Sequence, residues 1–203
     1  MGRIGTANRE TGEVNIAIEL RLDEENLEQK ICLTTMKEEP DVSVEIFQHL
    51  IAQILRFAKI WGHITGKGDL PHHLIEDVAI CLGQALRNAL GKREGIARTA
   101  SHIMPMEGSL ITVSVDMGGR GYATIDVRDM DNKSLAGMFQ HFLTAVATHG
   151  GFDLYAKVET VGDLSIRSDH HKIETLGKAL GKILREAMAI EGTYILSTKD
   201  TLT

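Results

Sequence analysis

The most informative feature of the chain is a histidine-rich motif that occurs twice. His72-His73-Leu74-Ile75-Glu76 and His170-His171-Lys172-Ile173-Glu174 share the pattern HHxxE and use four of the nine histidines in 203 residues. Imidazole and carboxylate groups are common ligands of first-row transition metals. Because adjacent histidines on a helix point about 100° apart, each member of a pair is expected to serve a different metal ion. The repeated motif therefore predicts a two-metal site in which its two copies come together.

The duplication extends beyond these ligands. Residues 72–90 and 170–188 align with nine identities at an offset of 98, and both place apolar residues three and four positions apart, as helices do. Upstream, Phe47-Gln48-His49 and Phe139-Gln140-His141 form a second repeated pair. Two copies at so long a period do not make a solenoid. The pattern instead predicts two fused half-domains that form one structural unit, at residues 1–95 and 96–203.

The remaining patterns predict a mixture of strands and helices. Alternating apolar residues predict a strand over 14–22 paired with a short strand around Ile31 and Leu33, and a second hairpin of 111–115 with 122–127. The other expected elements are helices over 46–61 and 135–148 and a strand over 152–158. This mixed order indicates an α+β fold, in which each half packs two helices on one face of a small mixed or antiparallel sheet.

Composition argues against several classes of function. The net charge of −6 at neutral pH argues against a nucleic-acid partner, which needs a basic surface. No apolar run approaches the ~20 residues of a membrane-spanning helix, and residues 1–6 lack the apolar region of a signal peptide. Cys32 and Cys81 do not make a disulfide framework. The sequence therefore predicts a cytoplasmic protein without a nucleic-acid or membrane partner.

Several short motifs follow one another along nearly the whole chain. They are Arg9-Glu10-Thr11-Gly12-Glu13, the two HHxxE motifs, Gly95-Ile96-Ala97-Arg98, Gly119-Arg120 and Ser197-Thr198-Lys199. This ordered series resembles the imidazoleglycerol-phosphate dehydratase family, the manganese enzymes of histidine biosynthesis, from about residue 9 to residue 202. A single HHxxE motif would be weak evidence, whereas two copies at matching places in the series are specific.

The resemblance implies a fold, an assembly and an active site. The family's fold is ribosomal S5 domain 2-like, its chains form a homo-oligomer of 24 subunits, and its active sites lie at subunit interfaces. Each active site is expected to hold two Mn²⁺ ions, with Zn²⁺ or another divalent metal as an alternative. The residues at the family's metal-ligand positions are His49, His72, His73, Glu76, His170, His171 and Glu174. The residues at positions around the substrate phosphate are Arg98, Arg120, Lys178, Ser197 and Lys199.

The implied reaction is the dehydration of imidazole glycerol phosphate, a phosphorylated small molecule, to imidazole acetol phosphate by a metal-dependent hydro-lyase. Metal ions bound to the substrate's imidazole would favour its electron-rich form, from which the hydroxyl can leave. Glu13, Glu76 and Glu174 are the candidate catalytic carboxylates, and Glu13 is the first candidate for moving protons. His141, the counterpart of His49, has no comparable ligand role in the family and is expected to be structural.

Two stretches depart from the family pattern. Asp153-Leu154-Tyr155 stands where the family has a threonine-leucine-histidine sequence whose histidine is a metal ligand, and Glu107-Gly108 stands where it has two acidic residues. A tyrosine phenol has a pKa of about 10 and seldom binds Mn²⁺ unless it is deprotonated. Two alternatives to the dehydratase therefore stay open. One is a divergent relative with a different phosphorylated substrate, and the other is a non-catalytic metal-binding assembly protein.

Overall fold

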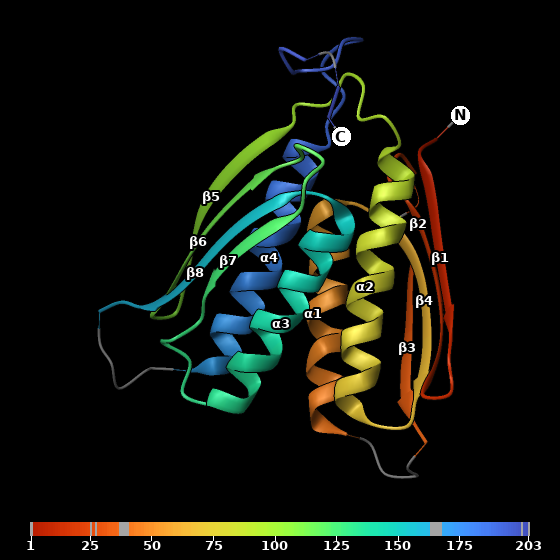
Figure 1. Ribbon diagram of the computed structural model, residues 1–203. Helices are drawn as coiled ribbons and strands as arrows, with labels where there is room; N and C mark the ends of the chain where they lie inside the picture. Colours follow the sequence, from red (N-terminus) through yellow and green to blue (C-terminus); the bar gives the residue numbers. More distant parts are fainter. Residues whose placement is uncertain are drawn as a thin grey trace.

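The chain folds into four layers: a sheet, two pairs of helices and a second sheet (Figure 1). The structure, a computed structural model, describes residues 2–24, 26, 28–36, 41–162, 168–199 and 201–202. The first half contains β1 (Ile4–Glu10), β2 (Val14–Arg21), β3 (Gln29–Thr35), α1 (Val42–Ala58), β4 (Trp61–Gly68) and α2 (Pro71–Leu90). The second half contains β5 (Thr99–Met106), β6 (Ser109–Asp116), β7 (Tyr122–Asp126), α3 (Lys133–Gly150), β8 (Asp153–Thr160) and α4 (Asp169–Ala187).

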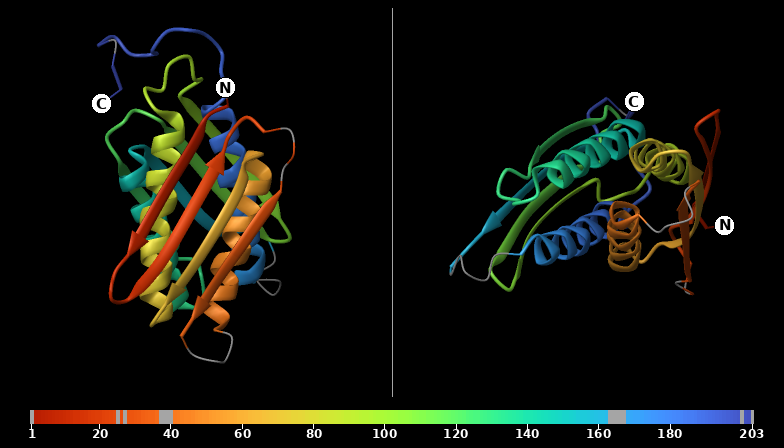
Figure 2. Two further views of the ribbon diagram at one scale, coloured as in Figure 1. Left: turned by 90° about the vertical axis from the view of Figure 1, so that its right-hand side faces the viewer. Right: turned by 90° about the horizontal axis from the view of Figure 1, so that it is seen from below.

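Both halves have the same sheet topology, which confirms the predicted α+β fold of two repeated half-domains. The strand orders are β1-β2-β4-β3 and β5-β6-β8-β7, and the left view of Figure 2 shows the first sheet face-on. In each sheet one outer pair is parallel, β3 with β4 and β7 with β8, and the helix between those strands makes the crossover. The predicted boundary at residues 95 and 96 falls between α2 and β5 and stays a prediction.

Both predicted hairpins are wrong. The strand that contains Ile31 and Leu33 pairs with β4 and not with β2, and β7 pairs with β8 and not with β6. The reason is that both sides of β2 are occupied, by β1 and β4, and both sides of β6 by β5 and β8. An alternating pattern identifies the buried face of a strand, but it does not identify the neighbouring strand.

The sequence patterns also miss three strands, β1, β4 and β5, and extend the helix over 46–61 too far. The helix α1 ends at Ala58, its C-cap Lys59 has a left-handed φ of 56°, and Trp61 begins β4. Glycines weaken the strand signal of β4. Two of them, Gly66 and Gly68, face α2, because a Cβ atom added to Gly68 would lie 2.9 Å from the Cβ atom of Leu74. The missing side chains let α2 pack close to the sheet.

The helices of the two halves pack in mixed pairs. The helix α1 packs on α4 and α2 packs on α3, so each HHxxE helix contacts the Phe-Gln-His helix of the other half. Gly83 and Gly181 make these contacts close, because a Cβ atom on either would lie 2.6 Å from a backbone oxygen of the facing helix. At the centre the buried rings of Phe47 and Phe139 stack with their centroids 4.6 Å apart. The half-domains therefore share one apolar core.

All four helices begin at the same end of the molecule, the lower end in Figure 1, and the right view of Figure 2 looks onto that end. The segment after α4 lies at the opposite end. His72 stands near the start of α2 and Arg98 beyond its end, and the 20 residues of α2 extend over about 30 Å. The histidine motifs and the C-terminal motif therefore lie at opposite ends. None of the helices in the described ranges is long and apolar enough to cross a membrane.

Candidate active site

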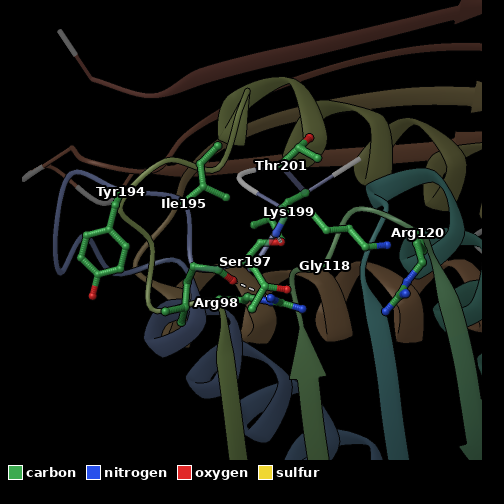
Figure 3. A pocket seen from close by; sticks show the side chains of 11 residues that line it. Arg98, Gly118, Arg120, Tyr194, Ile195, Ser197, Lys199 and Thr201 are labelled. Carbon is green, nitrogen blue, oxygen red and sulfur yellow. Dashed lines mark hydrogen bonds between the residues drawn. The ribbon is translucent and has the colours of Figure 1, made fainter.

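An open pocket of about 770 Å³ lies at the C-terminal end of the helices (Figure 3). It brings together four of the five residues predicted around a phosphate, Arg98, Arg120, Ser197 and Lys199. They come from three separate segments: the residue before β5, the loop between β6 and β7, and the tail after α4. The pocket is lined in addition by Gly118, Tyr194, Ile195, Leu196, Thr198, Thr201 and Leu202.

Arg98 contacts two of the segments that surround the pocket, the end of β6 and the tail after α4. Its guanidinium donates two hydrogen bonds to the Asp116 carboxylate, of 2.7 and 2.9 Å, and one of 2.5 Å to the carbonyl oxygen of Leu196. The hydrogen bond to Asp116 is the main cause that raises the pKa of Arg98. Arg120 is more available, since its side chain is 72% exposed and its guanidinium lies 4.0 Å from Asp153. The pocket thus offers an anion one anchored and one solvent-exposed cation.

Lys178, the fifth residue predicted around the phosphate, lies outside this pocket. It stands on α4, where its Nζ atom lies 2.8 Å from the Glu174 carboxylate and 3.7 Å from the sulfur of Met106. This ion pair is the main cause that lowers the pKa of Glu174. Lys178 therefore belongs to the histidine end of the chain.

The first HHxxE motif is surrounded by carboxylates. The Nδ1 atom of His73 lies 2.9 Å from Asp69 and 3.8 Å from Glu13, which stands in the turn between β1 and β2. The hydrogen bond to Asp69 is the first cause that raises the pKa of His73, and the charge of Glu13 adds to it. The structure thus places Glu13 beside a predicted ligand. Asp69 was missed, although its position four residues before His73 fits a carboxylate that orients an imidazole.

Two further groups of side chains form between the halves. In one, the His49 and His170 rings have centroids 6.3 Å apart, and the His170 Nε2 atom lies 3.7 Å from Glu174. In the other, His141 Nε2 lies 3.2 Å from Glu76. His141, expected to be structural, is thus 62% exposed in its side chain and faces a predicted ligand. The repeat of the Phe-Gln-His sequence was the signal for this position.

The expectation that one chain brings its two HHxxE motifs together is wrong. The motifs lie on α2 and α4, which pack on α3 and α1. Within the described part of the chain, no three or more histidine, cysteine, aspartate or glutamate side chains are grouped closely enough to hold a metal ion. The reason is the mixed helix pairing, which places each motif beside the other half's Phe-Gln-His helix. His171, for its part, lies 3.1 Å from Glu107.

The side chains at the histidine end nevertheless suit a transition metal. Imidazole nitrogens and carboxylate oxygens are the donors that Mn²⁺ and Zn²⁺ take in proteins. Among the described residues, each group in one chain has fewer than three such donors close enough to hold one metal ion. Tyr155, at the place of the family's additional histidine, lies on β8 between Ser114 and Thr124 of the neighbouring strands and is 39% exposed. It lies on the sheet face that points away from the helices, apart from the other predicted ligands.

These observations define a class of protein: a duplicated α+β fold with paired histidine-carboxylate motifs at one end and an anion pocket at the other. Comparison with known families then gives the particular one. The chain belongs to the imidazoleglycerol-phosphate dehydratase family, whose model matches residues 42–136 and 134–194.

Individual relatives match over the full length. The imidazoleglycerol-phosphate dehydratase of Deinococcus deserti is 35% identical over 210 residues, which cover 100% of both chains. That of Methanosarcina mazei is 36% identical and covers 98% of this chain and 100% of its own. The crystal structure of the Pyrococcus furiosus protein has a TM-score of 0.77 and 29% identity, covering 97% of this chain and 100% of its own. The Staphylococcus aureus structure, with a TM-score of 0.71 at 22% identity and coverage of 92% and 99%, shows the shared fold.

Proposed function

We propose that the protein is a metal-dependent hydro-lyase of histidine biosynthesis that dehydrates imidazole glycerol phosphate to imidazole acetol phosphate. The observation that carries the proposal is the pocket with Arg98, Arg120, Ser197 and Lys199, in a chain that also has both HHxxE motifs. The substrate has a phosphate for the pocket and an imidazole for the metal ions. Relatives that match this chain over its full length bear the name of this enzyme.

The pocket would hold the substrate phosphate. Arg98, Arg120 and Lys199 would donate charge-assisted hydrogen bonds to it, and the Ser197 hydroxyl would add a neutral one. Because Asp116 orients the Arg98 fork, the phosphate would bind in a defined position and so place the reacting carbons. Lys178 lies at the histidine end, so it would reach this phosphate only across an interface between copies.

We propose two Mn²⁺ ions per active site as cofactors, with Zn²⁺ or another divalent metal as the alternative. The ligands would come from His49, His72, His73, Glu76, His170, His171 and Glu174. When bound, the metal ions act as Lewis acids that favour the deprotonated, electron-rich form of the substrate's imidazole. The nearby Asp69 would hold His73 in a fixed orientation through its hydrogen bond of 2.9 Å.

The protons would be moved by carboxylates. The reaction takes the hydroxyl from the carbon next to the imidazole and the hydrogen from the adjacent carbon, and the resulting enol becomes the ketone. Glu13 is the proposed acid-base group, because its side chain is 59% exposed at the histidine end and lies 3.8 Å from His73. Glu76 and Glu174 would contribute as catalytic carboxylates through their place at the metal ions.

The active site would form between copies of the chain. The two regions of one chain are separated by the length of α2, about 30 Å, which is more than a small substrate spans. A second copy that brings its anion pocket to the histidine end of the first would complete the site. This fits a homo-oligomer, with 24 subunits as the size that the family resemblance implies. A cytoplasmic location, expected from the sequence, is part of the same proposal.

A second candidate is a divergent relative that acts on a different phosphorylated substrate. Tyr155 favours it, because a phenol takes the place of an imidazole ligand and would change the metal's surroundings. Tyr155→His tests this alternative. A rise in dehydratase activity would identify the tyrosine as a weakened ligand, whereas a loss would give the tyrosine a role of its own.

The deciding experiment is turnover of imidazole glycerol phosphate by metal-depleted protein, with and without added Mn²⁺. We expect Mn²⁺-dependent release of imidazole acetol phosphate. Arg120→Gln should raise KM, whereas Arg128→Gln, which changes an arginine that is 89% exposed and paired with Asp126, should leave it unchanged. A folded, metal-loaded oligomer without turnover would contradict the proposal. That result would favour one of the two alternatives, a divergent relative with another substrate or a non-catalytic metal-binding assembly protein.

A further inference from the structure

Arg93 lies behind the anion pocket and does not line it. The residue is 4% exposed, and its backbone has a left-handed φ of 61°, which is rare for a side chain of this size. Its guanidinium donates hydrogen bonds of 2.5 to 2.7 Å to the carbonyl oxygens of Met117, Gly150 and Gly151. Since these three partners are neutral, burial is the first cause of the lowered pKa of Arg93. A buried cation in a strained backbone requires a structural reason.

The Met117 peptide connects Arg93 to Arg98, one of the two arginines of the pocket. Its N–H donates to the carbonyl oxygen of Arg98 at 2.9 Å, and its own carbonyl oxygen accepts from Arg93 at 2.7 Å. Gly118, the next residue, lines the pocket, and a Cβ atom there would lie 3.4 Å from the Arg98 guanidinium. Arg120 follows two residues later (Figure 3). The hydrogen bond from Arg93 thus holds the first peptide of the 117–121 loop, which carries Arg120.

The same loop rests on the end of α3, which Arg93 also holds. A Cβ atom on Gly121 would lie 2.7 Å from the Thr148 carbonyl oxygen, and one on Gly151 would lie 3.0 Å from both Gly119 and the Arg93 guanidinium. The carbonyl groups of Gly150 and Gly151 are at the end of α3, where intrahelical donors run out. Arg93 supplies those donors and so fixes the surface against which the loop packs.

We propose that Arg93 is a positioning residue for the anion pocket: it sets the distance between Arg98 and Arg120 by holding the 117–121 loop against the end of α3. The inference deepens the proposed function, because the anion that the pocket would bind is the substrate phosphate. Arg93 does not touch that phosphate. Its contribution is the geometry of the two guanidinium groups that do.

Inorganic phosphate binding to the full-length protein tests the proposal. Arg93→Lys keeps the positive charge but removes the planar guanidinium group that donates to three carbonyl oxygens. We expect Arg93→Lys to raise the Kd for inorganic phosphate about tenfold. It should raise KM for imidazole glycerol phosphate by a similar factor, while kcat changes less. The matched control is Arg3→Lys, since Arg3 binds the Met188 carbonyl oxygen and Asp23 without touching the pocket. It should lower the midpoint of urea unfolding and leave the phosphate Kd unchanged.

The inference is supported if Arg93→Lys weakens phosphate binding and Arg3→Lys does not. This holds even if the wild type turns over no imidazole glycerol phosphate. Unchanged phosphate binding in a folded Arg93→Lys protein overturns it and leaves Arg93 a support of the fold alone. A wild type that binds no phosphate overturns it as well. If Arg93→Lys does not fold, Gly121→Ala tests the same loop, because its Cβ atom would lie 2.7 Å from the Thr148 carbonyl oxygen at the end of α3. Gly121→Ala should weaken phosphate binding, and unchanged binding would overturn the inference.

Discussion

The two HHxxE motifs have the same backbone setting but different anchors. At the third position the first motif has Leu74, fully buried against the glycines of β4, and the second has Lys172, which is 1% exposed. The Lys172 ammonium donates to the carbonyl oxygen of Asp129 and lies 3.7 Å from the carboxylates of Asp129 and Asp169. One half thus anchors its motif by apolar packing and the other by an ionic network around a buried lysine. Equivalent positions in a duplicated fold need the same geometry, but not the same interaction.

The largest expected effect tests whether the two motifs are equal in function. Under the proposed mechanism Glu76→Gln and Glu174→Gln should each lower kcat about a hundredfold to ten-thousandfold, because each removes a carboxylate from the metal-bound site. Turnover and bound metal per chain are the measurements. Glu186→Gln, at the far end of α4 and paired with Lys182, is the control and should stay active. Loss in only one of the two variants would break the functional symmetry of the halves.

A matched pair of substitutions separates the two anchors. Lys172→Met should lower the free energy of unfolding by about 1.5–3 kcal/mol, because it removes the charged hydrogen bond to the Asp129 carbonyl oxygen and the cation beside two partly exposed carboxylates. Leu74→Met conserves volume and should cost less than about 1.5 kcal/mol. Urea denaturation of both proteins gives the comparison. Equal losses would mean that the ionic network is not what holds the second motif.

The glycines between the helices should behave alike in both halves. Gly83→Ala and Gly181→Ala each place a Cβ atom 2.6 Å from a backbone oxygen, so each should cost about 1–3 kcal/mol through overpacking. Thermal unfolding measures the loss, and Gly137→Ala is the control, since in the described part of the chain no atom outside its own helix backbone lies within 4 Å of a Cβ atom there. A loss in one variant only would show that one helix pair separates more easily.

The smallest expected effect concerns Cys81, which aligns with Ala179 in the second half. Burial raises the pKa of the Cys81 thiol to about 11, so at pH 8 it is protonated and should not react with a thiol reagent in the folded protein. Cys81→Ala copies the second half and should cost about 1 kcal/mol or less. Rapid labelling of Cys81 before unfolding would contradict this packing.

The sequence was most informative where the repeat kept residue identities. It was enough to predict two half-domains and the HHxxE helices, whereas the grouping of Arg98, Arg120, Ser197 and Lys199 was implied by the family resemblance. It did not identify the partners of the motifs, because His141 and Glu76 are 65 positions apart and meet only through the mixed helix pairing. Charged residues such as Lys172 and Arg93 are rarely buried, so nothing in their neighbourhood indicated that they would be.

The parallel start of all four helices gives the chain a direction, with a histidine pole and an anion pole. In the proposed assembly each site joins the anion pole of one copy to the histidine pole of another, which makes the contact heterologous. Such contacts continue from copy to copy until rotation closes them, and without closure they grow into filaments. In any closed assembly, a ring or a shell, every pole is then used and none is left to recruit another subunit.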